Sequence, residues 1–208
     1  PATSSTATAS SVVDSDASDD ADTNSGNGAC ITTAGSCSLR AAIQEANAHV
    51  GADYITFAIA GSGPHRIEVT RALPRVVDGG LIIDGYTQPG AVPNNDPLVS
   101  NAVIAIEVHG DDTYAYDGFT VVSANNRLRG LAIFGFRRPV LIYGSSASNN
   151  AIMGSFVGTD STGTYAVPTL QDLGHGIHIE QDAPRTTVGS SNPADRNVIS
   201  GNGRHGIG

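Results

Sequence analysis

Charged and aromatic residues are scarce in this sequence. Of its 208 residues, 15% are charged and 5% are aromatic, and tryptophan is absent. Acidic residues outnumber basic ones by 20 to 11, which gives a formal net charge of -9. Binding to a nucleic-acid backbone or to an anionic membrane needs a basic surface, so this charge argues against both as the main partner.

Long hydrophobic runs are also missing. No stretch of roughly eighteen consecutive apolar residues occurs, so we expect no transmembrane segment. The first residue is Pro1 and not methionine, and the Ser-, Thr- and Ala-rich start is typical of a mature chain whose export signal has been removed. Glycine, by contrast, is abundant, with 25 residues, which suits a protein of short strands and tight corners.

Cysteine occurs only twice, at Cys30 and Cys37. A metal site usually takes a shorter cysteine spacing with further Cys or His ligands nearby, and a redox pair usually reads C-x-x-C. We therefore favour a local disulfide between the two cysteines over either alternative. A disulfide implies an oxidising compartment, so we expect a periplasmic, cell-surface or secreted protein.

The sequence from Gly118 onward repeats itself imperfectly. Similar phrases begin at Gly118, Val140 and Gly176, and a fourth starts at Gly206, at intervals of roughly 20–40 residues. Each phrase has a β-branched run, a small polar turn, a second short run and an Asn- or Gly-rich corner. Units of this size cannot bury a face alone but can stack into one continuous core, so the repeats predict a β-solenoid. A β-sandwich is the structural alternative.

Short runs rich in Val and Ile continue from Asp53 to the end, without helical segments between them. The predicted strands are 54–59, 65–70, 80–84, 103–109, 119–122, 127–134, 140–143, 151–157, 176–180, 186–188 and 197–200. Residues 38–49 are the one predicted helix, because an apolar stripe begins at Leu39 and Ser38 stands at the N-cap position. We expect this short amphipathic helix to cap the N-terminal end of the strands.

Three regions emerge from this pattern. Residues 1–28 are an acidic Ser/Thr/Asp-rich tail or linker, residues 29–52 hold the disulfide loop and the capping helix, and residues 53–208 hold the strands. The acidic run also suggests calcium, because alternating Asp and Asn oxygens bind Ca²⁺. The candidate metal ligands are Asp14, Asp16, Asp20, Asp22 and Asn24. An EF-hand register starting at Asp20 fails at its glycine and glutamate positions, so a solvated linker is the favoured interpretation.

Two longer insertions interrupt the strands, at 84–101 and 159–175. Long ordered loops often carry function, and insertions in repeat proteins tend to gather on one binding face. These insertions, an arginine pair after two phenylalanines and a pair of histidines supply the candidate binding residues. They are Tyr86, Gln88, Asn94, Asn95, Arg137, Arg138, Tyr165, His175 and His178. For the arginines and histidines, a solvated surface position is the alternative.

Residues 37–43, Cys-Ser-Leu-Arg-Ala-Ala-Ile, resemble the signature of an N-terminal module of bacterial surface and secreted proteins that is named for its Cys-Ser-Leu-Arg-Glu-Ala sequence. The phrases at 83–90, 156–164 and 197–202 resemble the right-handed parallel β-helix, or pectin-lyase-like, repeats that usually come after that module. The resemblance covers roughly residues 14–208. It implies an all-β protein, a right-handed parallel β-helix solenoid with a short N-terminal capping α-helix. Ala41 departs from the signature, whose Glu would form a capping box with Ser38.

Parallel β-helix proteins include polysaccharide lyases and hydrolases, so clustered carboxylates need weighing. Asp111, Asp112 and Asp117 fall between two strands, and paired carboxylates can serve glycoside hydrolysis or bind calcium. The same residue types also form turns, and we favour a turn here. We therefore predict no catalytic residue, and no cofactor apart from the calcium alternative.

These observations predict an exported, non-catalytic module for binding, adhesion or scaffolding within a cell-surface or periplasmic assembly. A polysaccharide lyase or glycoside hydrolase acting in a groove along the strands is the alternative. The expected partner is another protein or a carbohydrate. The last repeat stops at Gly208 and leaves a bare strand edge, so we expect more chain or a partner to cover it.

Overall fold

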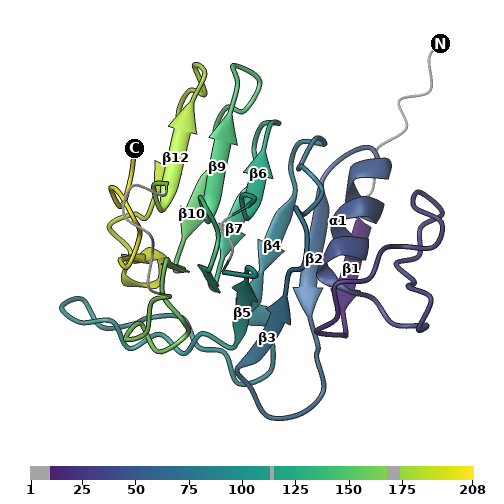
Figure 1. Cartoon of the computed structure of the whole chain (residues 1–208), viewed down its shortest axis with the longest axis horizontal. Helices are drawn as coiled ribbons and strands as arrows, with labels where there is room; N and C mark the ends of the chain where they lie inside the picture. Colours follow the sequence, from purple (N-terminus) through teal and green to yellow (C-terminus); the bar gives the residue numbers. More distant parts are fainter. Residues whose placement is uncertain (1–9, 113–114, 168–173) are drawn as a thin grey trace.

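The computed structural model describes residues 10–112, 115–167 and 174–208. Its strands form three sheets in which every pairing is parallel. Consecutive strands mostly belong to different sheets, so neighbours within one sheet come from distant parts of the sequence. Figure 1 shows the strands side by side along the longest axis of the molecule, with β1 near one end and β12 near the other.

The sheets differ in size. The six-stranded sheet has the order β1 (Ser10–Asp14), β2 (Asp53–Phe57), β4 (Ile82–Asp84), β7 (Arg127–Arg129), β10 (Ala151–Met153) and β13 (Thr187–Val188). The five-stranded sheet has the order β14 (Val198–Ile199), β11 (Phe156–Val157), β8 (Leu131–Phe134), β5 (Ile106–His109) and β3 (His65–Glu68). The three-stranded sheet has the order β12 (Ile177–Glu180), β9 (Val140–Tyr143) and β6 (Phe119–Val121). Two 3-10 turns, η1 (Gly85–Thr87) and η2 (Pro193–Asp195), complete the elements.

The core lies between the three sheets, and strand register builds it. In the six-stranded sheet, Ile55, Ile83 and Leu128 stand next to one another across β2, β4 and β7, and all are buried. Ile67, Val108 and Ile133 do the same across β3, β5 and β8. Alternate residues point to opposite faces of a strand, so β-branched residues at every second position place one continuous apolar row inside each sheet.

The helix α1 (Leu39–Ala48) belongs to this core. Ser38 caps it by accepting a hydrogen bond from the Ala41 amide at 3.2 Å. Leu39 and Ile43 are fully buried and join the same apolar cluster as the strands. The helix lies beside β1 and β2, at one end of the molecule (Figure 1).

The structure corrects the predicted fold class. Three parallel sheets of six, five and three strands enclose one core together with α1, which makes an α/β-type fold in place of the predicted all-β, right-handed parallel β-helix solenoid. The pattern of short strands did not predict that the helix contributes to the core. Leu39 and Ile43 give the same apolar stripe in the sequence whether the helix covers the end of a sheet or packs into the interior.

The elements themselves agree closely with the predicted pattern. Each predicted run contains a strand, the predicted helix forms, and the runs at 127–134 and 151–157 divide into two strands each, at Gly130 and Gly154. Both glycines have a positive φ, which turns the chain sharply from one sheet to the next. Within the predicted 1–28 tail, Ser10–Asp14 forms strand β1, because it pairs in parallel with β2. Residues 1–9 of that tail lie outside the described residues.

Recurring asparagines stack along one corner of the sheets. The Asn126 side chain donates to the Asn150 carbonyl oxygen Oδ1 at 3.1 Å, and Asn150 Oδ1 also accepts the Asn126 amide at 2.8 Å. Next to them, Asn149 donates to Asn125 at 3.3 Å. These four residues form an asparagine ladder, in which Asn150 also accepts the backbone amide of Asn126 at the turn between sheets.

Candidate functional site

The two insertions cover the outer face of the five-stranded sheet. Phe134 on β8 packs against Val167 of the second insertion, and Glu107 on β5 accepts hydrogen bonds from the Ser161 amide and hydroxyl. Burial would raise the pKa of Glu107, but these bonds and the Arg66 guanidinium outweigh it and hold that pKa below its usual value. Residues 168–173, in the predicted 159–175 loop, lie outside the described residues, and Tyr165 is half exposed.

The first insertion places most of its predicted binding residues in structural roles. Gln88 is buried and exchanges two hydrogen bonds with the Ile59 backbone, at 2.9 and 2.8 Å. Tyr86 donates its hydroxyl to the Gly154 carbonyl at 2.6 Å, and burial raises its pKa to about 12. Asn94 is buried too, whereas Asn95 is exposed.

The arginine pair is brought together with a carboxylate. Arg137 and Arg138 both bind Asp117, with Arg138 Nη2 at 2.7 Å from Asp117 Oδ2. Burial would raise the pKa of Asp117, but the hydrogen bonds and charges of the two arginines lower it instead. Arg138 also donates to Glu180 on β12 at 3.0 Å. The two arginines and the two carboxylates therefore neutralise one another. This pairing agrees better with a structural role for Arg137 and Arg138 at the surface than with a site that binds a free anion.

The two histidines among the predicted binding residues, His175 and His178, lie beside this arginine pair. The rings of His175 and His178 lie 4.6 Å apart, and the His205 ring lies 5.2 Å from that of His175. Burial, together with the positive neighbours His178 and His205, lowers the pKa of His175. His178 Nδ1 lies 3.2 Å from Arg138 Nη1.

The carboxylates at 111, 112 and 117 point to different partners. Asp112 Oδ1 lies 3.0 Å from His109 Nε2, while Asp117 binds the arginine pair. Burial and the nearby Asp111 raise the pKa of Tyr116 to about 12. The three side chains are therefore divided among separate contacts, and the turn interpretation accounts for their positions.

A charged row on β3 and β5 was missed by sequence reasoning. Glu68 Oε2 lies 2.7 Å from His109 Nδ1, so this imidazole stands between Glu68 and Asp112. Arg66 donates to Glu107 at 2.8 Å in the neighbouring row. The alternation of Arg66 with Glu68 and of Glu107 with His109 was the available signal, because residues two apart share one face of a strand.

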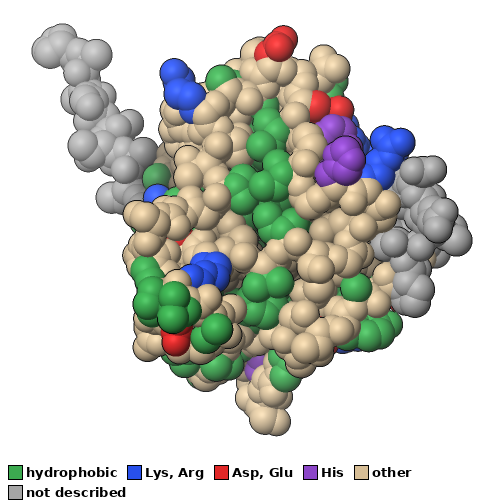
Figure 2. Space-filling model, turned by 90° about the vertical axis from the view of Figure 1, so that its left-hand side faces the viewer, with side chains coloured by type: hydrophobic (Ala, Val, Ile, Leu, Met, Phe, Trp, Pro, Cys, Tyr) green, Lys and Arg blue, Asp and Glu red, His purple; other side chains and the backbone are tan. Residues whose placement is uncertain are grey.

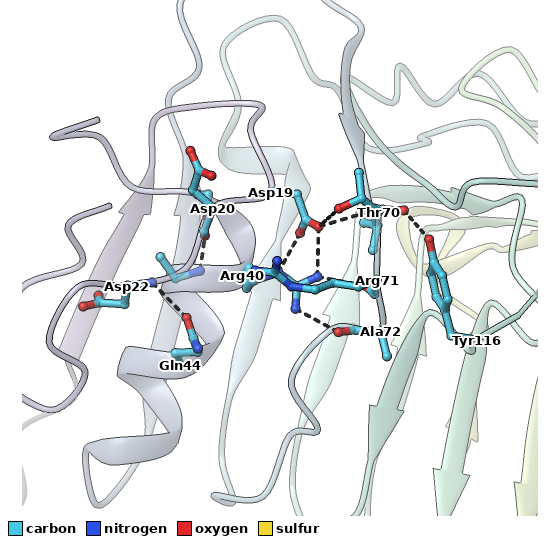
Figure 3. A network of polar contacts seen from close by, with 12 residues as sticks. Asp19, Asp20, Asp22, Arg40, Gln44, Thr70, Arg71, Ala72 and Tyr116 are labelled. Carbon is cyan, nitrogen blue, oxygen red and sulfur yellow. Dashed lines mark hydrogen bonds and ion pairs between the residues drawn. The ribbon is translucent and has the colours of Figure 1, made fainter. Parts of the chain in front are cut away.

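The acidic run at the N-terminus is dispersed by the fold. Asp14 is fully buried beside Phe57, and burial raises its pKa to about 8. Asp16 accepts the Ser36 hydroxyl at 2.7 Å, and Asp22 accepts the amides of Asn24 and Ile31. The Asp20 side chain is exposed (Figure 3). Among residues 10–112, 115–167 and 174–208, no group of three or more His, Cys, Asp or Glu side chains is placed to hold a metal ion.

The signature arginine is held in a buried network that the sequence did not reveal. Arg40 binds Asp19 through Nε and Nη2, both at 2.9 Å, and donates to the carbonyls of Arg71 and Ala72 (Figure 3). Asp19 also accepts the amide and hydroxyl of Thr70 at 3.0 Å. One arginine thus ties the N-terminal loop and α1 to the chain after β3. The Cys30–Cys37 disulfide predicted from spacing is present in the same loop.

The end of the sheets opposite α1, which we call the end face, carries partly exposed apolar side chains. β13, β14 and the bridge at Ile207 are the last pairing segments there, and within the described residues no strand pairs with their outer edges. Val188, Ile199 and Ile207 line a pocket of about 350 Å³ on this end. Figure 2 looks onto it and shows hydrophobic side chains in a line down its middle.

A protruding loop borders the end face. Residues 92–103, which we call the arm, are closed at their base by an antiparallel bridge between Val92 and Val103. The Asn94 side chain donates to the Pro193 carbonyl at 2.8 Å, and Arg196 donates to the Pro97 carbonyl. In Figure 1 this loop reaches past the last strands, and Pro97 lines the end-face pocket.

Comparisons with known proteins give no relative. No protein-family model, no curated protein and no solved structure matches this chain. In the part of the chain that the structure describes, no helix is long and apolar enough to cross a membrane.

Proposed function

We propose that this chain is an exported, non-catalytic module that binds or scaffolds within a cell-surface or periplasmic assembly, and that the end face is its docking surface. The observation that carries this proposal is the coincidence of two features on one surface. Within the described residues no strand pairs with the outer edges of β13 and β14, so their backbone N–H and C=O groups face outward, and Val188, Ile199 and Ile207 offer apolar area beside them. Edges of this kind pair readily with another polypeptide.

A protein suits this surface better than a carbohydrate. The pocket is lined by aliphatic side chains, proline, glycine, serine, asparagine and one arginine, Arg196, and among the described residues that line it there is no aromatic ring on which a sugar would stack. Export is supported by the Cys30–Cys37 disulfide and by the resemblance of residues 37–43 to a module of bacterial surface proteins.

The docking surface is tested by crosslinking in a bacterium that makes and exports the protein. A photo-crosslinking amino acid replaces Ile207 on the end face or, as the matched control, Val50 beside α1, which is 80% exposed. We expect protein adducts from position 207 and none from position 50. Exported protein that yields no protein adduct at position 207 would contradict the proposal.

The absence of catalysis is tested separately with a panel of acidic and neutral polysaccharides, with and without Ca²⁺. We expect neither unsaturated products nor new reducing ends. Product from any of these substrates that disappears in an Asp112→Asn or Glu68→Gln variant would favour the lyase or hydrolase alternative, because these carboxylates flank His109.

A further inference from the structure

We infer that the arm carries a self-cleavage site, at which the Asp96 carboxylate attacks the carbonyl carbon of its own residue and releases Pro97 as a new N-terminus. Residues 96 and 97 are the one Asp-Pro pair in the sequence. The cleavage happens once in each molecule, so it goes beyond the proposed function, and it does not depend on the end face. It follows from the way in which the arm holds both sides of this peptide bond.

The Asp96 carboxylate is folded back over the bond that follows it. Its Oδ1 accepts the amides of Val99 and Leu98, at 3.0 and 2.7 Å. These hydrogen bonds close rings that contain the Asp96–Pro97 peptide bond, so the carboxylate is held beside its own carbonyl carbon. Both bonds end on Oδ1, which leaves Oδ2 for the attack. The same two amides lower the pKa of Asp96, so the carboxylate stays ionised, and therefore nucleophilic, in mildly acidic solution.

A buried side chain holds the carbonyl oxygen of the same residue. Asn94 Nδ2 donates to the Asp96 carbonyl oxygen at 3.0 Å and to the Pro193 carbonyl oxygen at 2.8 Å. Asn94 is 1% exposed, and its Oδ1 accepts the Asn101 amide at 2.8 Å, so its amide group is fixed in place. A fixed donor on this oxygen stabilises the negative charge that develops there when the carbonyl carbon is attacked.

Pro97 supplies a leaving group that other residues do not. Its nitrogen belongs to a tertiary amide without an N–H, and it leaves as a basic secondary amine. Arg196 donates to the Pro97 carbonyl oxygen, so the leaving side of the bond is held as well. When the reacting groups are already held together, a ring closure replaces a bimolecular encounter, which accelerates the step by orders of magnitude.

The reaction is a ring closure followed by hydrolysis. Asp96 Oδ2 forms a bond to the Asp96 carbonyl carbon, and the bond from that carbon to the Pro97 nitrogen breaks. The nitrogen keeps the electron pair and takes a proton from solvent, which leaves a cyclic aspartic anhydride at residue 96. Water then opens the anhydride, so the two fragments together weigh one water molecule more than the chain. The sequence has no lysine, so no lysine amine of this chain competes with water.

The two fragments should stay together after cleavage. Strands on both sides of the bond pair with one another, because β4 pairs with β7 and β3 pairs with β5. The shared core therefore does not depend on the peptide bond between residues 96 and 97. Cleavage frees the tip of the arm, where Leu98 is 87% exposed, as part of a new N-terminal segment.

The test is mass spectrometry of the denatured protein after the folded wild type has been incubated at pH 5 and at pH 8. We expect fragments 1–96 and 97–208, formed faster at pH 5 because the leaving nitrogen needs a proton. Added hydroxylamine should trap the anhydride, so that fragment 1–96 ends in a hydroxamate, which a contaminating protease would not produce. The Asn192–Pro193 bond has no carboxylate before it and should stay intact.

Variants separate the roles of the two side chains. Asp96→Asn should slow cleavage at least about tenfold, because it removes the nucleophile. Asn94→Ala should also slow it about tenfold or more, because it removes the donor to the carbonyl oxygen. Asp160→Asn is the matched control and should cleave like wild type, since Asp160 also accepts two amides of its loop but is followed by Ser161. Circular dichroism confirms that each variant keeps its fold.

Unfolded wild type shows whether the fold drives the reaction. In concentrated urea the arm loses its hydrogen bonds, and we expect the same bond to break at least about tenfold more slowly. The inference is overturned by folded wild type that does not break between residues 96 and 97, or that breaks without forming the hydroxamate. It is also overturned if Asp96→Asn, Asn94→Ala or the urea-unfolded chain is cleaved as fast as folded wild type, or if Asp160→Asn is slowed equally. None of these outcomes bears on the docking surface, which crosslinking tests separately.

Discussion

At the scale of single residues, Asp14 is the most unusual group in the molecule. Its side chain is fully buried on the inward side of β1, and Oδ2 is buried without a hydrogen-bond partner among the described residues. Burial raises its pKa to about 8, from 3.8 when exposed. The folded protein therefore holds this proton more tightly than the unfolded chain. Asp14 leaves stability intact below about pH 4 and lowers it progressively as the pH rises towards 8, at about 1.4 kcal/mol per pH unit.

Asp14→Asn should remove this loss, because the amide resembles the protonated acid and does not ionise. We expect the free energy of unfolding of the variant to match wild type near pH 4 and to exceed it at pH 7, by on the order of 3 kcal/mol. Urea unfolding at the two pH values measures the difference. The exposed Asp20→Asn is the control and should show no such pH-dependent gain; an equal gain there would refute the assignment.

The ion pair of Asp19 and Arg40 makes the opposite prediction. Both side chains are buried, at 6% and 5% exposure, so removing one charge strands the other in the interior. Asp19→Asn should cost about 3–5 kcal/mol in the free energy of unfolding at pH 7. In a double-mutant cycle, Arg40→Met should restore part of that loss when added to Asp19→Asn. Additive losses would show that the two charges do not act as a pair.

At the scale of elements, the asparagine ladder links strands that are far apart in the sequence. Asn150 is buried, donates to the Ser123 carbonyl and accepts from the Asn126 amide. Asn150→Ala removes the acceptor of the buried Asn126 amide, while the Ser123 carbonyl keeps its bond from the Asn126 side chain. We expect a loss of about 1–3 kcal/mol in thermal or urea unfolding.

The matched change is one residue away. Asn149 is exposed and has φ 56°, a conformation that glycine adopts without strain, so Asn149→Gly should alter stability by less than about 1 kcal/mol. If both variants lost equal stability, the buried amide would not be the cause.

At the scale of the whole molecule, we expect the protection of backbone amides against hydrogen exchange to decrease towards the end face. β8 lies between β5 and β11, whereas β14 has a neighbour on one side only within the described residues. We expect amides of β14 to exchange with solvent at least about tenfold faster than those of β8 in a dilute, monomeric sample. Hydrogen exchange measured by NMR or mass spectrometry reads both strands in one experiment. Uniform protection of both strands would contradict an open end.

Features that depend on residues close together in the chain could be predicted from the sequence, whereas features that depend on distant residues could not. The predicted strands, the helix with its Ser38 cap and the disulfide all formed, because alternation, capping and short cysteine spacing act within a few residues. The fold class was wrong, since local patterns do not say whether a helix enters the core. Of the predicted binding residues, Gln88 and Asn94 are buried and serve the fold, because a polar residue in a loop looks the same whether it faces water or a backbone.

The sequence by itself determined the positions of the strands and of the helix, because backbone preferences and hydrophobic alternation act between residues that are close in the chain. The tertiary structure alone decided which distant groups meet. It put Arg40 on Asp19, set His109 between Glu68 and Asp112, buried Asp14, and carried the arm from the first insertion to the far end of the molecule. Apart from the local His109–Asp112 pair, these contacts join residues tens of positions apart, which parallel pairing of strands brings together. Only the assembled core fixes that register, because each short strand gains its apolar burial from neighbours that the linear chain does not identify.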